Sequence, residues 1–250
     1  MKSDAADLLE IFSSIQGEGS LIGRRQVFVR FIGCNLACLY CDTNADIHAG
    51  LCKAERTPGR LDFQEITNPV ALQTVVDLLQ QWERGWPHVH HSISLTGGEP
   101  LLHVDLLQGW LPQLSQILPI HLETNGVLHG ALSRVITLID TVSMDIKLPS
   151  SSGETGLWED HRHFLEIAVQ KDVSVKIVVN SVTQHWEIQR AAGIIKTVAE
   201  NIPLIIQPET AADLTIKISP LGLFELQEIA ADIIPDVRII PQTHRFIGLL

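Results

Sequence analysis

The chain has 250 residues, of which 45% are hydrophobic and 19% are charged. This balance excludes a disordered chain and a coiled coil, and the length is enough to close a hydrophobic core. The 18 Lys and Arg against 29 Asp and Glu give a formal net charge of −11, which repels polyanions such as tRNA at long range. We therefore expect a small-molecule partner and no nucleic acid.

The first residues and the hydropathy of the chain indicate where in the cell the protein is expected. Residues 1–7 carry acidic side chains where a signal peptide needs a basic and then an apolar stretch. No apolar run approaches the roughly 18 residues that span a membrane. We expect a cytoplasmic protein with no membrane partner and, because no Pro/Ser/Gly-rich linker divides the chain, a single domain over residues 1–250.

Short apolar, β-branched runs alternate along the chain with longer amphipathic runs, a pattern typical of βα units around a parallel sheet. The predicted fold class is therefore α/β. Strands are predicted at 27–32, 92–96, 120–123, 141–145, 175–179 and 204–207, with a further edge strand at 237–240. Helices are predicted at 70–84, 104–117, 158–170, 184–199 and 222–233, with a weaker pattern at 127–138. Residues 44–68 and 149–156 are predicted loops, either exposed connections or lids over a site.

Polar segments follow the predicted strands. They are residues 33–43, 97–100, 124–126, 145–147, 180–181 and 208–210. In parallel βα folds, the loops at the carboxyl ends of the strands form one rim and hold the active site. The sequence therefore predicts that these segments converge in space.

Three of the four cysteines, Cys34, Cys38 and Cys41, lie within eight residues, and Cys52 stands apart. In a reducing compartment such a group favours metal over disulfides. Structural zinc usually takes four ligands, and a fourth from His48 or Cys52 would have irregular spacing. Three thiolates suit an iron–sulfur cluster with one iron left open. We favour the cluster over zinc and expect Cys52 to be a free thiol.

The spacing Cys34-x3-Cys38-x2-Cys41, with Gly97-Gly98-Glu99-Pro100 after the second strand, resembles the radical S-adenosylmethionine superfamily. The resemblance implies a partial (β/α)6-type barrel with its site at the strand carboxyl ends. It also implies a [4Fe-4S] cluster whose open iron is chelated by S-adenosylmethionine. Gly97 and Gly98 allow close backbone approach to a ligand, and Glu99 can accept a hydrogen bond from an ammonium group.

Further segments narrow the resemblance. Residues 15–19 (Ile-Gln-Gly-Glu-Gly), Arg30, 41–43 (Cys-Asp-Thr) and 242–245 (Gln-Thr-His-Arg) resemble the 7-carboxy-7-deazaguanine synthases, over nearly the whole chain. This family converts 6-carboxy-5,6,7,8-tetrahydropterin to 7-carboxy-7-deazaguanine with loss of ammonia, a carbon–nitrogen lyase step toward queuosine and other 7-deazapurines. The resemblance implies Mg2+, a homodimer, and an electron donor such as flavodoxin or ferredoxin.

The same resemblance implies roles for individual residues. The cluster ligands are Cys34, Cys38 and Cys41, and the Mg2+ ligand is Thr43. The S-adenosylmethionine contacts are Tyr40, Asp42, Gly98, Glu99, Ser143, Asp145, Lys147 and Gln207. The substrate contacts are Ile15, Gln16, Gly17, Arg30, Thr96 and His244.

Two of these substrate residues have a clear chemical rationale. The Gln16 amide offers both a donor and an acceptor to a pterin edge. The Arg30 guanidinium can bind a substrate carboxylate bidentately, although it could instead form an ion pair with Glu99 or Asp42. Two alternatives to the synthase remain open: a glycyl-radical-enzyme activase, which shares the cysteine motif, and a non-catalytic metal-binding interaction module.

Overall fold

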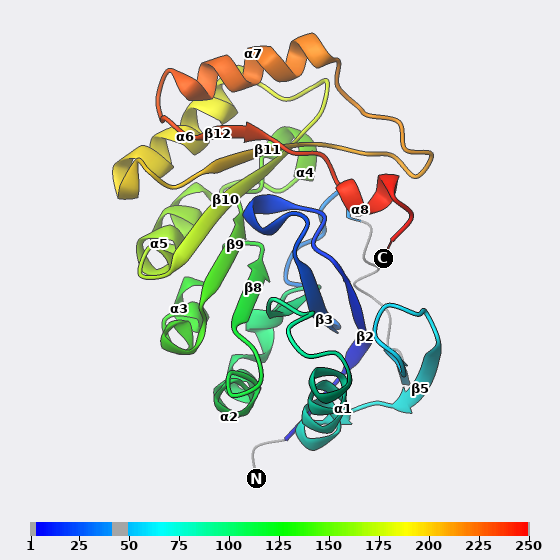
Figure 1. The fold of residues 1–250 in the computed structure, drawn as a ribbon. Coiled ribbons are helices and arrows are strands. Elements are labelled where there is room, and N and C mark those ends of the chain that lie inside the picture. Colours follow the sequence, from blue (N-terminus) through cyan, green and yellow to red (C-terminus); the bar gives the residue numbers. More distant parts are fainter. Residues whose placement is uncertain (1–3, 42–49, 250) are drawn as a thin grey trace.

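The computed structural model describes residues 4–41 and 50–249 (Figure 1). Within them, ten strands form one sheet in the order β12-β11-β10-β9-β8-β7-β3-β2-β4-β5. Seven neighbouring strands of this sheet, β3 and β7 to β12, are mutually parallel and lie side by side in chain order. Their bounds are β3 (Arg25–Phe31), β7 (Ile93–Gly97), β8 (Ile120–Thr124), β9 (Thr141–Asp145), β10 (Asp172–Val179), β11 (Leu204–Pro208) and β12 (Val237–Ile239).

Helices cover the outer face of this parallel sheet, which curves without closing because β12 and β5 are its two edges (Figure 1). The longer helices are α1 (Leu72–Gly85), α2 (Val104–Leu114), α5 (Trp158–Ala168), α6 (His185–Ala199) and α7 (Pro220–Ala231). Short helical turns are η1 (Gly19–Leu21), η2 (Pro100–His103), α3 (His129–Leu132), η3 (Ile136–Leu138), α4 (Pro149–Ser152) and α8 (Thr243–Phe246). The α/β class and the partial, open barrel are therefore confirmed.

The parallel strands are apolar on one face and polar on the other. Residues such as Val29, Leu95 and Leu122 are fully buried in the core beneath the helices. Their neighbours in sequence, such as Arg30 and Thr96, point to the opposite, concave face, because successive side chains of a strand alternate. Most parallel sheets are apolar on both faces, so a polar concave face indicates that it surrounds a binding site.

The predicted strands and long helices are confirmed, with ends that differ by a few residues. For example, α2 ends at Leu114 rather than at 117. The weak pattern at 127–138 contains the short helices α3 and η3. No helix among the described residues is both long and apolar enough to cross a membrane.

Two predicted loops contain regular structure instead. Residues 44–49 lie outside the described residues, but the rest of the 44–68 segment includes an antiparallel hairpin of β4 (Leu51–Glu55) and β5 (Phe63–Thr67). The hairpin extends the sheet because β4 pairs in parallel with β2 (Leu8–Ile15). Within 149–156, Pro149 begins the single-turn helix α4.

The sequence prediction missed β2, which is antiparallel to β3. Its pattern is broken by a register shift between Leu8 and Glu10, and Phe12, Ser13 and Ser14 are all buried. Strict alternation is therefore lost, although the strand is firmly paired. A second, two-stranded sheet joins β1 (Ala5–Ala6) to β6 (Val70–Ala71).

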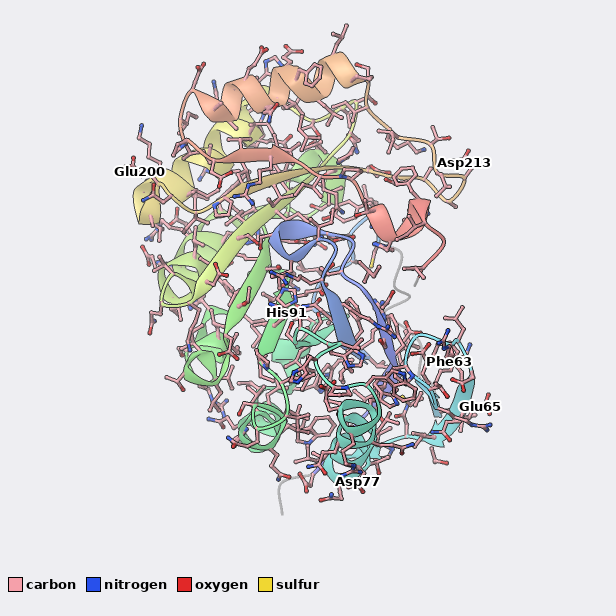
Figure 2. All side chains as sticks on the ribbon, in the orientation of Figure 1. Phe63, Glu65, Asp77, His91, Glu200 and Asp213 are labelled. Atoms are coloured by element: carbon pink, nitrogen blue, oxygen red, sulfur yellow. The ribbon has the colours of Figure 1, made fainter. Side chains whose placement is uncertain are left out.

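Several acidic side chains are exposed at the periphery of the molecule. Glu65, Asp77, Glu200 and Asp213 are all exposed and lie around the outside of the molecule (Figure 2). They come from β5, α1, the end of α6 and the loop after β11. The net negative charge is thus compatible with a cavity that contains several basic groups.

Candidate active site

A cavity of about 540 Å3 opens on the concave face of the sheet. Its lining includes the cysteine loop after β3 and the polar residues that end β7, β8, β9 and β11. The predicted convergence of these strand ends is confirmed. The segment after β10 is the exception: Asn180 hydrogen-bonds Glu209, and Ser174, Lys176 and Val178 inside the strand line the cavity instead.

Most of the predicted site residues meet in this cavity, although their roles stay predictions. Asp42 and Thr43 lie outside the described residues. Among those described, the residues that line the cavity are Ile15, Gln16, Gly17, Arg30, Cys34, Cys38, Tyr40, Cys41, Thr96, Gly98, Ser143, Asp145, Lys147, Gln207 and His244. Glu99 is absent from the lining.

The cysteine loop is held by its own turn and by the segment around α4. The Cys41 amide donates to the Cys38 carbonyl at 3.0 Å. The Leu39 amide donates to the Ser152 carbonyl at 2.9 Å, and the Ala37 amide donates to the Glu154 carboxylate at 2.7 Å. Residues 149–156 therefore support the cysteine loop.

The donor set of this loop fits the cluster predicted from the sequence. Cys34 and Cys38 are partly buried, Cys41 is exposed, and all three thiols line the same cavity. Soft thiolates are the ligands of iron–sulfur clusters. Across residues 4–41 and 50–249, no three His, Cys, Asp or Glu side chains converge as ligands of a single metal ion. Cys52 is a free, fully buried cysteine, as expected.

Glu99 is absent from the cavity lining and its carboxylate is hydrogen-bonded within the protein, so its predicted contact with S-adenosylmethionine stays a prediction. The side chain is fully buried, and it accepts hydrogen bonds from the Leu101 amide at 3.0 Å and the Asn125 amide at 2.8 Å. The Thr124 hydroxyl donates to both carboxylate oxygens. Burial raises the pKa of Glu99 to about 7 despite these donors. Glu99 joins η2 to the end of β8.

Arg30 forms an ion pair, but with a partner that the sequence analysis did not name. Its Nε lies 2.7 Å from Oε1 of Glu10 on β2, and the guanidinium lies over the Phe12 ring at 5.7 Å. Of the two predicted partners of this ion pair, Glu99 is not paired with Arg30, and Asp42 lies outside the described residues. Because the ion pair uses Nε, the two terminal nitrogens can still bind a carboxylate in the cavity.

The Gln16 amide lines the cavity and is hydrogen-bonded within the protein, and its predicted contact with a pterin stays a prediction. Its Nε2 donates to Gln26 at 3.0 Å and to Glu123 at 2.8 Å, which uses both N–H bonds. Its oxygen accepts from the Glu18 amide at 3.0 Å. Gln16 therefore orients its neighbours, and only the remaining lone pair of its oxygen is available to a ligand.

Glu123 is the most prominent cavity residue that the sequence analysis missed. Oε1 accepts from the Ser94 hydroxyl at 2.5 Å as well as from Gln16, and Oε2 accepts from the Thr96 hydroxyl at 3.1 Å. Three donors hold the carboxylate in one orientation at the cavity wall. The alternation of His121 and Glu123 with apolar residues in β8 was the signal that could have identified it.

A directional hydrogen-bond chain runs beneath the cavity to Ser143. Gln26 Nε2 donates to Ser92 at 2.7 Å and to His121 Nδ1 at 3.2 Å. His121 is buried, which lowers its pKa, so the ring is neutral and carries its proton on Nε2. Nε2 then donates to the Ser143 hydroxyl at 2.8 Å. The Ser143 hydroxyl is thereby left as a donor toward the cavity.

Asp145 and Lys147, both predicted to contact S-adenosylmethionine, line the cavity. Lys147 Nζ is 2.7 Å from Asp145 Oδ2 and 3.2 Å from the Tyr40 hydroxyl oxygen. The ammonium also lies over the Tyr40 ring, 5.4 Å from its centre. Burial raises the pKa of Tyr40 to about 12, so the phenol keeps its proton and accepts from the lysine.

His161 of α5 joins the loops after β8 and β9. The Lys147 amide donates to its Nε2 at 3.1 Å, so Nδ1 carries the proton and donates to the Gly126 carbonyl at 3.0 Å. The ring is fully buried, and this burial lowers its pKa to about 4. A neutral His161 thus supports the strand ends without contacting the cavity.

The C-terminal segment closes one side of the cavity. The amide and hydroxyl of Thr243 both donate to the Gly17 carbonyl, at 3.0 and 2.8 Å. His244 packs so closely on Gly17 that a Cβ there would overlap its ring. Arg245 donates to the carbonyls of Thr210 and Ala211, at 2.5 and 3.0 Å. The two ends of the chain thus form one wall of the site.

Comparisons with known proteins agree with this arrangement. The chain matches the model of the Radical SAM superfamily over residues 28–187. A 7-carboxy-7-deazaguanine synthase from Geobacter sulfurreducens is 57% identical over 250 residues, which cover 100% of both chains. The enzyme of that name from Methanothermobacter thermautotrophicus is 34% identical over 270 residues, 98% of each chain.

Solved structures support the fold. The crystal structure of QueE from Escherichia coli has a TM-score of 0.59 at 19% identity and covers 96% of this chain and 95% of its own. A radical SAM methyltransferase from Sphaerobacter thermophilus has a TM-score of 0.54 at 12% identity, covering 93% of this chain and 77% of its own. The chain therefore belongs to the radical S-adenosylmethionine superfamily and, within it, to the family of 7-carboxy-7-deazaguanine synthases.

Proposed function

We propose that this chain converts 6-carboxy-5,6,7,8-tetrahydropterin to 7-carboxy-7-deazaguanine with loss of ammonia, a lyase step of 7-deazapurine biosynthesis. The observation that carries the proposal is one cavity lined both by the three cysteines of the radical motif and by Arg30, Thr96 and Glu123. When bound, the [4Fe-4S] cluster and S-adenosylmethionine supply the one-electron cleavage that starts the radical chemistry.

The cofactor half of the cavity lies around the cysteine loop. Cys34, Cys38 and Cys41 would hold the cluster, and the backbone of Gly98 would lie against the methionine end of S-adenosylmethionine. Ser143, as a directed hydroxyl donor, and the charged pair Asp145 and Lys147 would bind its polar groups. The remaining cofactor contacts of the proposal are Tyr40, Gln207, Asp42 and Glu99.

The substrate half lies between β3, β7, β8 and the C-terminal segment. Arg30 would bind the substrate carboxylate, and Glu123 would accept hydrogen bonds from N–H groups of the pterin edge. The other substrate contacts of the proposal are Thr96, Ile15, Gln16, Gly17 and His244. Closure of the wall by residues 242–245 would exclude water from reactive species.

The proposal also includes partners and a metal ion. Mg2+, with Thr43 as its ligand, would bind the substrate carboxylate as a Lewis acid. The enzyme would be a cytoplasmic homodimer of single-domain chains that receives electrons from a flavodoxin or ferredoxin. The acidic periphery and small cavity suit a free pterin better than a nucleic acid.

Anaerobic turnover tests the proposal. Reconstituted protein is incubated with a reductant, S-adenosylmethionine, Mg2+ and the carboxytetrahydropterin, and the expected product is 7-carboxy-7-deazaguanine, detected by its mass. No product from protein with an intact cluster, beside an active control enzyme, would overturn the proposal and favour the activase alternative. A colourless protein loaded with zinc would favour the non-catalytic module.

A further inference from the structure

Lys176 is a largely buried cation that lines the cavity and that the proposed roles above do not use. It comes from β10, and its ammonium contacts the Glu18 carboxylate and lies 3.4 Å from Asp145 Oδ1. The three side chains are 15 to 19% exposed, and all of them line the cavity. Lys176 thus lies between Asp145 in the cofactor half and the turn 17–19 in the substrate half.

Lys176 and its two carboxylate neighbours, Glu18 and Asp145, stabilise one another's charged forms. Burial alone would lower the pKa of Lys176, but the Asp145 and Glu18 carboxylates raise it above its ordinary value. Burial alone would raise the pKa of Glu18, yet Lys176 and a hydrogen bond from Gln242 lower it to about 2. Asp145 has a second cation, Lys147, at 2.7 Å. Loss of Lys176 would therefore leave Glu18 worse compensated than Asp145.

Glu18 connects Lys176 to the C-terminal segment. Its second oxygen accepts from Gln242 Nε2 at 2.7 Å. The neighbouring Gly17 carbonyl accepts the two hydrogen bonds from Thr243, and His244 packs on Gly17. A continuous series of contacts therefore runs from β10 through Glu18 to the wall of the substrate half.

We propose that Lys176 is a positioning residue that holds the turn 17–19 and the segment 242–245 against each other, so that the substrate half of the cavity is assembled around its charge. The substrate half is the one assigned under the proposed function, and the inference rests on it for the kinetic effect alone. If Lys176 is replaced, Asp145 still has its ion pair with Lys147, so the cofactor half should change less than the substrate half.

Hydrogen exchange of the reconstituted enzyme, without substrate, tests the structural part. In Lys176→Met we expect amides of peptides covering residues 16–19 and 242–245 to exchange at least tenfold faster than in wild type. Lys176→Arg, which keeps the charge, should restore most of the protection. Lys196→Met is the matched control, because Lys196 is exposed on α6. Wild-type exchange in both peptides of Lys176→Met would overturn the proposal.

Kinetics test the functional part. Lys176→Met should raise KM for the pterin at least tenfold while iron content and KM for S-adenosylmethionine change less than threefold. An equal loss for both ligands would contradict the assignment to the substrate half. If wild type forms no deazaguanine, the proposed function fails, but the exchange result still decides the role of Lys176.

A second variant covers the case in which Lys176→Met does not fold. Glu18→Gln removes the charge at the other end of the contact, and the same faster exchange of residues 242–245 is expected. Lys176→Met that cannot fold, together with wild-type exchange in Glu18→Gln, would show that the pair serves global stability only, and would overturn the proposal.

Discussion

Gly98 packs directly against Gly33, so closely that a Cβ on Gly98 would overlap the Gly33 carbonyl oxygen. The same carbonyl accepts from the Glu99 amide at 2.8 Å, and the Gly98 amide donates to the Phe31 carbonyl at 3.1 Å. The Gly-Gly turn after β7 is thus attached to the residues that begin the cysteine loop. Two motifs far apart in the sequence therefore form one structural unit beside the cavity.

Gly98→Ala should disrupt this unit. The added methyl meets backbone rather than a flexible side chain, so the turn and the cysteine loop must separate, at a cost of about 1–3 kcal/mol. We expect at least tenfold weaker S-adenosylmethionine binding by the reconstituted protein, measured by equilibrium titration. Gly109→Ala is the control: it lies in α2 with nothing within 4 Å, and should stabilise the fold by roughly 0.5–1 kcal/mol. Unchanged affinity in Gly98→Ala would contradict this interpretation.

Cys38→Ala and Cys52→Ala should differ in cluster content. Cys38 lines the cavity, whereas Cys52 is fully buried in β4 and apart from it. After anaerobic reconstitution we expect Cys38→Ala to lose most of its iron, its brown colour and its turnover. Cys52→Ala should retain about four irons per chain, as wild type does. Equal losses in the two variants would refute the division into three ligands and one free thiol.

Glu123→Gln should weaken substrate binding selectively. The carboxylate accepts hydrogen bonds from Ser94, Thr96 and Gln16, and an amide has only one oxygen with which to replace it. We expect KM for the pterin to rise at least tenfold, while cleavage of S-adenosylmethionine without substrate stays within threefold of wild type. Glu65→Gln, on the exposed surface of β5, is the control (Figure 2). A wild-type KM would show that Glu123 does not contact substrate.

His161 should lower the free energy of unfolding as the pH falls below about 6.5. Its pKa is about 4 in the folded protein against 6.5 for an ordinary histidine. As the pH falls, the unfolded chain therefore binds a proton at a higher pH than the folded protein does, which favours unfolding. The stabilisation is complete above pH 6.5 and is lost as the pH falls toward 4. From these values, His161 alone contributes a loss of roughly 2 kcal/mol between pH 8 and pH 5.

Denaturant unfolding at the two pH values checks this expectation. His161→Gln can still donate and accept but does not titrate, so its loss of stability between pH 8 and pH 5 should be smaller than that of wild type. His163→Gln, exposed on the same helix, should behave like wild type. The expectation fails if His161→Gln and wild type lose the same free energy.

The order of the strands and helices followed from local patterns. The alternation of apolar runs predicted β7 to β12, because each strand buries alternate residues beneath the helices whatever the details of the site. Where pairing depends on distant partners, as for β2 and the hairpin of β4 and β5, the local pattern was insufficient. Register and neighbouring strands decide those elements.

The sequence by itself determined the cysteine motif, the Gly-Gly turn and the family, since these depend on residue types at fixed spacings. Only the tertiary structure decided which polar groups face the cavity. It buried Glu99 under four donor contacts, engaged the Gln16 amide with Gln26 and Glu123, and placed Lys176 between Glu18 and Asp145. The physical reason is that a polar side chain takes its orientation from hydrogen-bond partners on other strands, which spacing along one strand does not specify.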